Sequence, residues 1–258
     1  PHYALKALSV NEAASEMVTF QDNFARSALE VEFGLMLRKI AKSSRDSARP
    51  PPVHGLLGFS DIIKPKKKKR NNRGQKFGLL LQPLLDGSLK ALTGQLADGA
   101  NMPVQVMLDA AVDVTTQLEF FHVFSNYIHS DIKPANILLD AKSRPKIGDF
   151  GLARLTGETE GDGIIYGTPD YIAPEVLKNP GAVDTRSDVF STGIILYELL
   201  TGKLPEKNYI PASQIEDVDP RFDKIVRRAT HPSPMLRFAD GEAMATDLKN
   251  LREALENQ

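Results

Sequence analysis

The sequence predicts an α+β fold, in which a small, mainly β part is followed by a larger, mainly helical part. The first third of the chain holds short runs of apolar and β-favouring residues, whereas the remainder holds apolar residues at helical spacing. Of the 258 residues, 41% are hydrophobic, which is enough for a buried core. We expect the boundary near Pro83, between a part at 1–82 and a part at 83–258.

Strands and one helix are expected in the first part. Residues 2–9 are rich in apolar and β-favouring side chains and predict a short strand. A helix follows, predicted by an apolar face that contains Phe33, Met36, Leu37 and Ile40. The polar stretch 43–52 finishes in three prolines and ends this helix. Two further strands are predicted, at 53–63 and 77–81.

Helices dominate the second part. The first is expected to start around Asn101 and Pro103, and its apolar face contains Met107, Ala111, Val114, Leu118 and Phe121. Short apolar pieces separated by polar turns follow, at 127–129, 137–139 and 145–148. A polar, glycine-rich stretch covers 151–170. The later helices are predicted at 186–200, where the helix is apolar and buried, and at 222–230 and 238–255.

Composition excludes several classes of protein. The sequence contains no cysteine, which excludes disulfide frameworks, thiolate metal sites and cysteine nucleophiles. No apolar run approaches the roughly 20 residues of a membrane span, so no membrane segment is expected. A cytoplasmic protein is the expectation. Because the first residue is Pro1 rather than Met, we expect a fragment or a processed product.

Basic charge is concentrated in one stretch. Residues 64–76 contain eight basic and no acidic side chains, and the rest of the chain carries 24 basic and 33 acidic residues, a net charge of −9. A protein with this distribution is not expected to bind nucleic acid. Two readings of the basic run KPKKKKR, at 64–70, stay open: a solvated loop between two strands, or a polyanion-binding or nuclear-localisation segment, which would make the location nuclear.

Residues suited to phosphoryl transfer gather in HSDIKPANILLD, at 129–140. This stretch contains Asp131, Lys133 and Asn136, and a second acid follows in Asp149–Phe150–Gly151. One carboxylate can take a hydroxyl proton, while the other carboxylate and the amide oxygen can hold Mg²⁺. The lysine can neutralise a migrating phosphoryl group. The alternative is a polar turn with ordinary surface charges, which the ordered set of residues disfavours.

With these motifs the sequence resembles the eukaryotic-type protein kinase family. The resemblance also covers ALKAL around Lys6, GTPDYIAPE at 167–175, SDVFSTG at 187–193 and HPSPMLRF at 231–238. It implies a two-lobed, protein-kinase-like fold, with an incomplete, mainly β N-lobe and a larger, mainly helical C-lobe. It also implies that Arg237 pairs with Glu175. The closing helices are similar to those of bacterial eukaryotic-like kinases.

The resemblance implies a role for each of the central residues. Asp131 becomes the catalytic base or orients the hydroxyl group, and Lys133 contacts the γ-phosphate. The residues implied to hold Mg²⁺ are Asn136 and Asp149. Lys6 would hold the α- and β-phosphates of ATP.

Further residues are implied around the nucleotide. The helix glutamate that pairs with the phosphate-binding lysine would be Glu32, with Glu30 as the competitor. Leu81 would be the gatekeeper, and the backbone of Gln82 and Leu84 would bind adenine. The alternative for these last three residues is an ordinary core strand and turn.

The lysine two residues after the catalytic Asp131 resembles serine/threonine kinases rather than tyrosine kinases. Thr168 would sit where the family threonine bonds the catalytic aspartate and lysine. The resemblance therefore implies a protein serine/threonine kinase that uses ATP and Mg²⁺ and acts on serine or threonine hydroxyls of proteins. The rivals are a pseudokinase or regulatory binding module, and a kinase of small molecules.

The sequence departs from the family pattern at two places. Ser130 stands where the catalytic loop of many kinases has an arginine that binds a phosphate. We therefore expect little effect from replacing Thr156 and Thr159, the candidate modified residues. No G-x-G-x-x-G precedes Lys6, so we expect truncation and no measurable turnover of chain 1–258.

Overall fold

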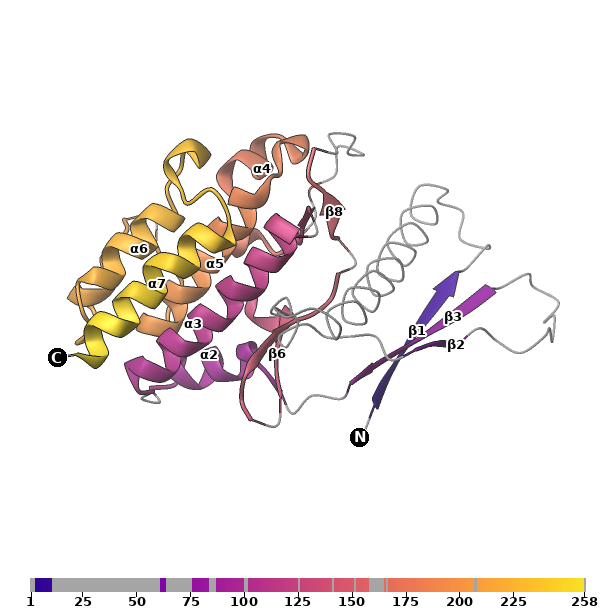
Figure 1. Cartoon of the computed structure of the whole chain (residues 1–258), viewed down its shortest axis with the longest axis horizontal. Helices are drawn as coiled ribbons and strands as arrows, with labels where there is room; N and C mark the ends of the chain where they lie inside the picture. Colours follow the sequence, from indigo (N-terminus) through magenta and orange to yellow (C-terminus); the bar gives the residue numbers. More distant parts are fainter. Residues whose placement is uncertain are drawn as a thin grey trace, which may run out of the picture. The chain divides into compact units, whose positions relative to one another are not determined.

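The computed structural model (Figure 1) describes part of the chain, and its described residues fall into two compact units. The first unit holds the strands before residue 84 together with residues 149, 150 and 152, and the second holds the other described residues. The residues described are 3–10, 61–63, 76–83, 87–99, 102–124, 126–140, 142–150, 152–157, 165, 167–206 and 208–257.

The first unit contains a three-stranded antiparallel sheet in the order β1-β3-β2. Its strands are β1 (Tyr3–Val10), β2 (Asp61–Ile63) and β3 (Lys76–Pro83). The strands predicted at 2–9 and 77–81 are confirmed, and the end of the strand predicted at 53–63 is confirmed at β2. The helix expected around Phe33, residues 64–75 of the basic stretch, and Glu30, Glu32 and Leu84 lie outside the described residues.

Four helices form most of the second unit, and Figure 1 shows them side by side. They are α3 (Val104–Glu119), α5 (Thr185–Thr201), α6 (Arg221–Ala229) and α7 (Gly241–Glu256). Each coincides with a helix predicted from the sequence, so these predictions are confirmed. The α+β architecture is confirmed as well.

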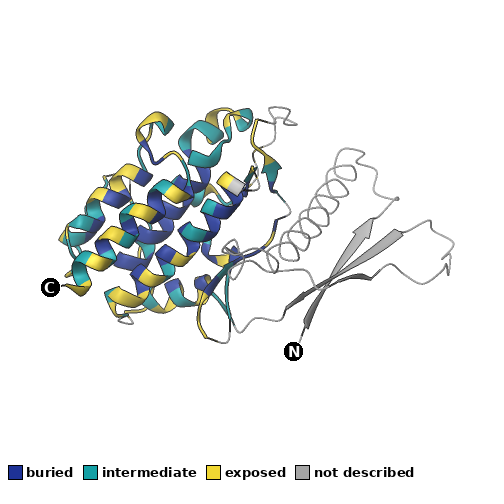
Figure 2. Ribbon diagram, viewed as in Figure 1, coloured by how far each residue is buried: buried dark blue, intermediate teal, exposed yellow. Residues whose placement is uncertain are grey.

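α5 is the central helix of this unit, and almost every residue between Ser187 and Thr201 is buried (Figure 2). Its start is fixed by a capping box, in which the Asp184 carboxylate accepts from the Arg186 N–H at 2.8 Å and Ser187 Oγ accepts from the Asp184 N–H at 3.2 Å. Gly202 ends it with a φ of 67°. Because α5 is buried along most of its length and capped at both ends, the other helices of the unit pack around it.

α3 and α7 pack so closely that one crossing point has no room for a side chain. A Cβ added at Gly241 would lie 2.5 Å from Leu118 Cβ and 2.6 Å from the Glu119 nitrogen. Around this contact lie the large side chains that form the core of the unit: Leu108, Leu118, Phe120, Phe121, Phe222 and Phe238. Full burial of one such side chain stabilises the fold by about 1.5–3 kcal/mol.

A π-helix, η3 (Phe120–Phe124), continues α3 for one wider turn. The sequence predicted an ordinary helix face that reached Phe121, so the structure differs here. The wider turn buries Phe120, Phe121 and His122 at successive positions, which a regular helix with one apolar face does not do. It thereby brings a polar ring into the core next to α5.

Small elements surround the helices. The short apolar pieces of the sequence form β5 (Tyr127–Ile128), β6 (Ile137–Leu139) and β7 (Pro145–Ile147). β6 lies between β4 (Gly87–Ser88) and β7, and β5 pairs with β8 (Arg154–Leu155). Two helices that the sequence did not predict are α2 (Leu89–Ala97) and α4 (Pro174–Lys178). No described helix is long and apolar enough to cross a membrane.

Candidate active site

The loop that carries the predicted catalytic residues leaves β5 at His129 and ends in the 3-10 turn η4 (Pro134–Asn136). Ser130 adopts a left-handed backbone conformation with a φ of 68°, which a non-glycine residue adopts only when its surroundings compensate. The compensation comes from α5. The backbone N–H groups of His129 and Ser130 donate to the Asp188 carboxylate at 2.7 and 2.9 Å.

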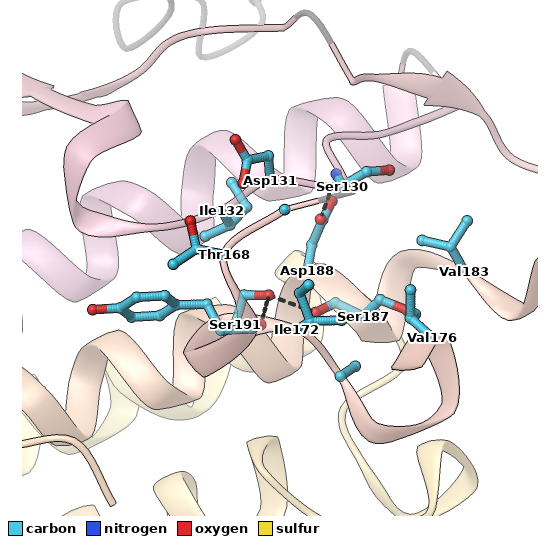
Figure 3. A pocket seen from close by; sticks show the side chains of 13 residues that line it. Ser130, Asp131, Ile132, Thr168, Ile172, Val176, Val183, Ser187, Asp188 and Ser191 are labelled. Atoms are coloured by element: carbon cyan, nitrogen blue, oxygen red, sulfur yellow. Dashed lines mark hydrogen bonds between the residues drawn. The ribbon is translucent and has the colours of Figure 1, made fainter. Parts of the chain in front are cut away.

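Asp188 is a buried charge that fastens this loop to the central helix. Its side chain is 1% exposed, and it also accepts a hydrogen bond from His122 Nε2 at 3.0 Å. Burial alone would raise the pKa of the Asp188 carboxyl, but the bonds from His122 and from the His129 backbone outweigh burial and hold this pKa below its ordinary value. The carboxylate therefore stays charged and holds the backbone of the loop in place through its hydrogen bonds, as Figure 3 shows for Ser130.

Two buried histidines have their protons fixed by their neighbours. His122 Nδ1 accepts from the Gly241 N–H at 3.1 Å, so the ring proton lies on Nε2 and is donated to Asp188. His129 Nδ1 accepts from the Asp131 N–H at 3.3 Å, so its Nε2 donates to the Gly148 carbonyl at 3.0 Å. The His122 ring thus links α7 to α5, and the His129 ring links the loop to Gly148.

The structure brings Asp131, Lys133 and Asn136 together. Lys133 Nζ lies 2.8 Å from Asp131 Oδ2, and Asn136 Nδ2 donates to the same oxygen at 2.8 Å and to the Asp131 carbonyl at 2.9 Å. The Asp131 side chain is 10% exposed, so it is oriented by its neighbours yet reachable. Since the Asn136 amide nitrogen faces Asp131, its amide oxygen is the atom that can bind a hard cation.

The residues predicted around the nucleotide lie in the first unit where they are described. Lys6 pairs with Leu80 across β1 and β3, and Gln82 pairs with Ala4. Asp149, which also belongs to this unit, is exposed and left-handed, with a φ of 59°. Asparagine and aspartate side chains tolerate this conformation better than most.

Asn136, in the second unit, offers an amide oxygen, and Asp149, in the first unit, offers a carboxylate. Both are hard oxygen donors, and Mg²⁺ is usually held by one or two protein groups plus phosphate oxygens and water. Among the residues the structure describes, no group of three or more His, Cys, Asp or Glu side chains gathers in a metal-binding cluster. The amide oxygen and the carboxylate are donors of the kind that Mg²⁺ takes.

An open hollow of about 490 Å³ adjoins Lys133 and Thr168. It is bounded by α2, by the loop and by the pair Tyr171–Glu198, in which the phenol donates to Glu198 Oε2 at 2.7 Å. Burial and this bond raise the pKa of Tyr171, so its proton stays in place. In the described part of the chain the Thr168 hydroxyl makes no hydrogen bond to Asp131 or Lys133.

The pairing expected between Glu175 and Arg237 is confirmed. The guanidinium donates to both carboxylate oxygens at 2.7 Å, and its side chain is 0% exposed. Arg237 Nε also donates to the His231 carbonyl at 2.7 Å, and the guanidinium lies 4.9 Å from the centre of the Phe190 ring. This bidentate pair fixes α4, and with it the end of GTPDYIAPE, to the helical core.

Sequence reasoning missed three buried polar residues: Asp188 and His122, which support the loop, and Gln117, which supports β7. Gln117 donates to the Pro145 carbonyl at 3.0 Å and accepts from the Ile147 N–H at 2.9 Å, which ties β7 to α3. A signal was available in the sequence, because each interrupts an otherwise apolar helix face or buried turn. Polar groups at such positions are retained when they bond to buried backbone.

Comparisons with known proteins agree with this geometry. A family model described as protein kinase domain matches residues 56–250. Serine/threonine-protein kinase PknL of Mycobacterium tuberculosis is 34% identical over 194 residues, which cover 69% of this chain and 47% of that protein. CBL-interacting protein kinase 21 of Oryza sativa is 36% identical over 163 residues, covering 57% of this chain and 30% of that protein.

Serine/threonine-protein kinase PknB of Mycobacterium leprae is 32% identical over 190 residues, covering 63% of this chain and 30% of that protein. The chain therefore spans less than half the length of these curated relatives. The family model, in contrast, matches most of the chain and includes the loop, α5 and the Glu175–Arg237 pair. The chain belongs to the protein kinase domain family, whose α+β fold it shares.

Proposed function

We propose that this chain is the catalytic part of a protein serine/threonine kinase, which transfers the γ-phosphate of ATP to serine or threonine hydroxyls of proteins. The observation that carries the proposal is the arrangement of Asp131. Its carboxylate is held by Lys133 and Asn136, and its backbone neighbours are fastened to Asp188. The names of the relatives, which are serine/threonine kinases, support the same reaction.

Asp131 performs the step at the acceptor. Its carboxylate accepts the hydroxyl proton or orients the hydroxyl oxygen for attack on the γ-phosphorus. Lys133 Nζ lies 2.8 Å from Asp131 Oδ2. Its positive charge can neutralise the negative charge of the phosphoryl group during transfer. A carboxylate pre-set by two neighbours needs little reorganisation in the transition state.

The first unit would supply the nucleotide contacts. We propose that Lys6 binds the α- and β-phosphates with Glu32 as its partner, and that the backbone of Gln82 and Leu84 binds adenine. Asn136 and Asp149 would hold Mg²⁺, which when bound neutralises phosphate charge. A protein segment bearing the acceptor would approach along the hollow next to Thr168.

The test is Asp131→Ala in a form of the protein with measurable turnover, assayed with ATP and a library of serine- and threonine-containing peptides. Turnover should fall by about 10²–10⁴, the usual worth of a positioned base. Nucleotide binding should change little. Asp217→Ala, which removes an exposed carboxylate elsewhere, is the matched control.

Turnover of the Asp131→Ala protein at the rate of the control would overturn the assignment. If the unmodified protein binds ATP but no form of it transfers phosphate, the rival reading as a pseudokinase is correct.

A further inference from the structure

Met235 exposes a sulfur atom in a chain that has no cysteine. It lies in the 3-10 turn η8 (Pro234–Leu236) and is 73% exposed, more than any other large apolar residue that the structure describes. The sequence holds six methionines and no cysteine, so thioether groups are its only sulfur chemistry. Among the other described methionines, Met107 and Met244 are buried in the core and Met102 is half-buried. Met235 is therefore the described methionine that an oxidant in solution reaches most readily.

A guanidinium group faces this sulfur. Arg186 Nη1 donates to Met235 Sδ at 3.1 Å. The same nitrogen lies 3.7 Å from the Asp184 carboxylate, so its contact with the sulfur is the shorter of the two. A thioether is only a weak acceptor. The charged donor of Arg186 is thus directed at a group that accepts a hydrogen bond poorly, and a stronger acceptor at the same place would bind it better.

Oxidation of the sulfur supplies such an acceptor. A lone pair of Sδ attacks one oxygen of hydrogen peroxide, and the S–O bond forms as the O–O bond breaks. The proton of the transferred hydroxyl passes to the departing hydroxide, so the sulfur is oxidised to a sulfoxide and the peroxide is reduced to water. The sulfoxide is polar, and a charged donor makes hydrogen bonds roughly twice as strong as a neutral one. Rotation about the Cγ–Sδ bond turns the new oxygen toward Arg186.

The contact lies where η8 is already fastened to the start of α5. Arg186 is in the first turn of α5, and its carbonyl accepts from Arg237 Nη1 at 3.1 Å. Thr185 Oγ1 donates to the Ala239 carbonyl at 2.7 Å, so the chain beyond η8 is attached to the same turn. A stronger bond between Met235 and Arg186 would add to these two attachments without displacing either of them.

We propose that Met235 is a site of oxidation by peroxide and that its sulfoxide oxygen accepts a hydrogen bond from Arg186. Oxidation here strengthens the attachment of η8 to α5, whereas a sulfoxide formed in a core disrupts the packing. Methionine sulfoxide reductases return the sulfoxide to the thioether, so the change is reversible. The site is separate from Asp131 and Lys133, and it does not depend on phosphoryl transfer.

The first experiment measures where oxidation occurs. The full chain is treated with a series of hydrogen peroxide concentrations, and peptide mass spectrometry follows each methionine. Met235 should be oxidised at least about tenfold faster than Met107 and Met244, because the thioethers of these two are shielded by the core. Equal rates at the three positions would overturn the assignment of Met235 as the site.

The second experiment tests the bond to Arg186. Oxidation limited to Met235 should raise the melting temperature by about 2 °C. The control is Arg186→Ala, in which oxidation of Met235 should leave the melting temperature unchanged or lower it. A fall in the melting temperature of the unsubstituted protein on oxidation, or equal shifts in the two proteins, would overturn the role of Arg186.

A pair of substitutions repeats this test without an oxidant. In Met235→Gln the amide oxygen stands where the sulfoxide oxygen would lie, whereas Met235→Leu offers no acceptor. Met235→Gln should melt about 2 °C above Met235→Leu, and the difference should vanish when each is combined with Arg186→Ala. A difference that persists without Arg186, or no difference in its presence, would contradict the bond. None of these measurements requires kinase turnover, so they stand even if the proposed function fails.

Discussion

The Asp188→Asn substitution keeps the shape of a buried side chain but removes the charge that fastens the loop at 129–136 to α5. The carboxylate accepts from the backbone of Ser130 through one oxygen, and from His129 and His122 through the other. Asparagine offers one oxygen and one NH₂ group. In either orientation at least one N–H donor then faces another donor.

The magnitude follows from these contacts. One hydrogen bond to a charged group is lost, at about 1.5–3 kcal/mol, and one buried donor is left unpaired, at about 1–3 kcal/mol. We expect Asp188→Asn to lower the free energy of unfolding by about 3–5 kcal/mol, measured by urea denaturation followed by circular dichroism. Asp247→Asn, which disturbs an exposed ion pair of 3.3 Å with Arg228, should cost less than about 1 kcal/mol.

The pH dependence gives a second readout. The folded pKa of Asp188 lies below its unfolded value of about 3.9. Its stabilising contribution is therefore complete above about pH 4 and is lost as the pH falls through the folded pKa. The stability difference between the protein and Asp188→Asn should shrink in that acid range. A loss below about 1 kcal/mol at neutral pH, or a difference that does not change with acid, would refute the reasoning.

Two further substitutions test the framework of the second unit by urea denaturation. Arg237→Lys keeps the charge but loses the bidentate geometry to Glu175, and should cost about 2–4 kcal/mol because the site is buried; a cost near zero would show that the pair contributes no stability. Gly241→Ala places a Cβ 2.5 Å from Leu118 and should cost about 1–3 kcal/mol, whereas Gly94→Ala, with nothing within 4 Å, should stabilise by about 0.5–1 kcal/mol. Equal effects of the two glycine substitutions would contradict the packing at the crossing of α3 and α7.

The long helices could be predicted from the sequence. In α3, α5, α6 and α7 the buried residues recur at helical spacing or fill the helix, so local sequence and tertiary packing agree. α2 and α4 lack that agreement. α2 carries Gly94 and buries only Leu89 and Thr93, and α4 is five residues long with no buried residue. Whether such short helices form depends on packing against neighbouring elements rather than on the apolar pattern of their own sequence.

The candidate site likewise contains some residues that the sequence could predict and others that it could not. Asp131, Lys133 and Asn136 are close in sequence, and a single loop is enough to bring them together, so their cluster could be predicted. Asp188 and His122 contact that loop or each other across 58 to 66 residues of sequence. Only tertiary packing creates such contacts. The local sequence pattern does not show which distant backbone N–H groups will donate to a buried carboxylate.

The attachment of the loop to α5 also determines how the loop can open. The amide protons of His129 and Ser130 are bonded to a carboxylate on the most buried helix of the unit. For either proton to exchange with solvent deuterium, the bond to α5 must break, and α5 cannot move without disrupting the core. Both amides should therefore exchange almost as slowly as those in the middle of α5. The loop that carries Asp131 and Lys133 then belongs to the last cooperative unit to unfold.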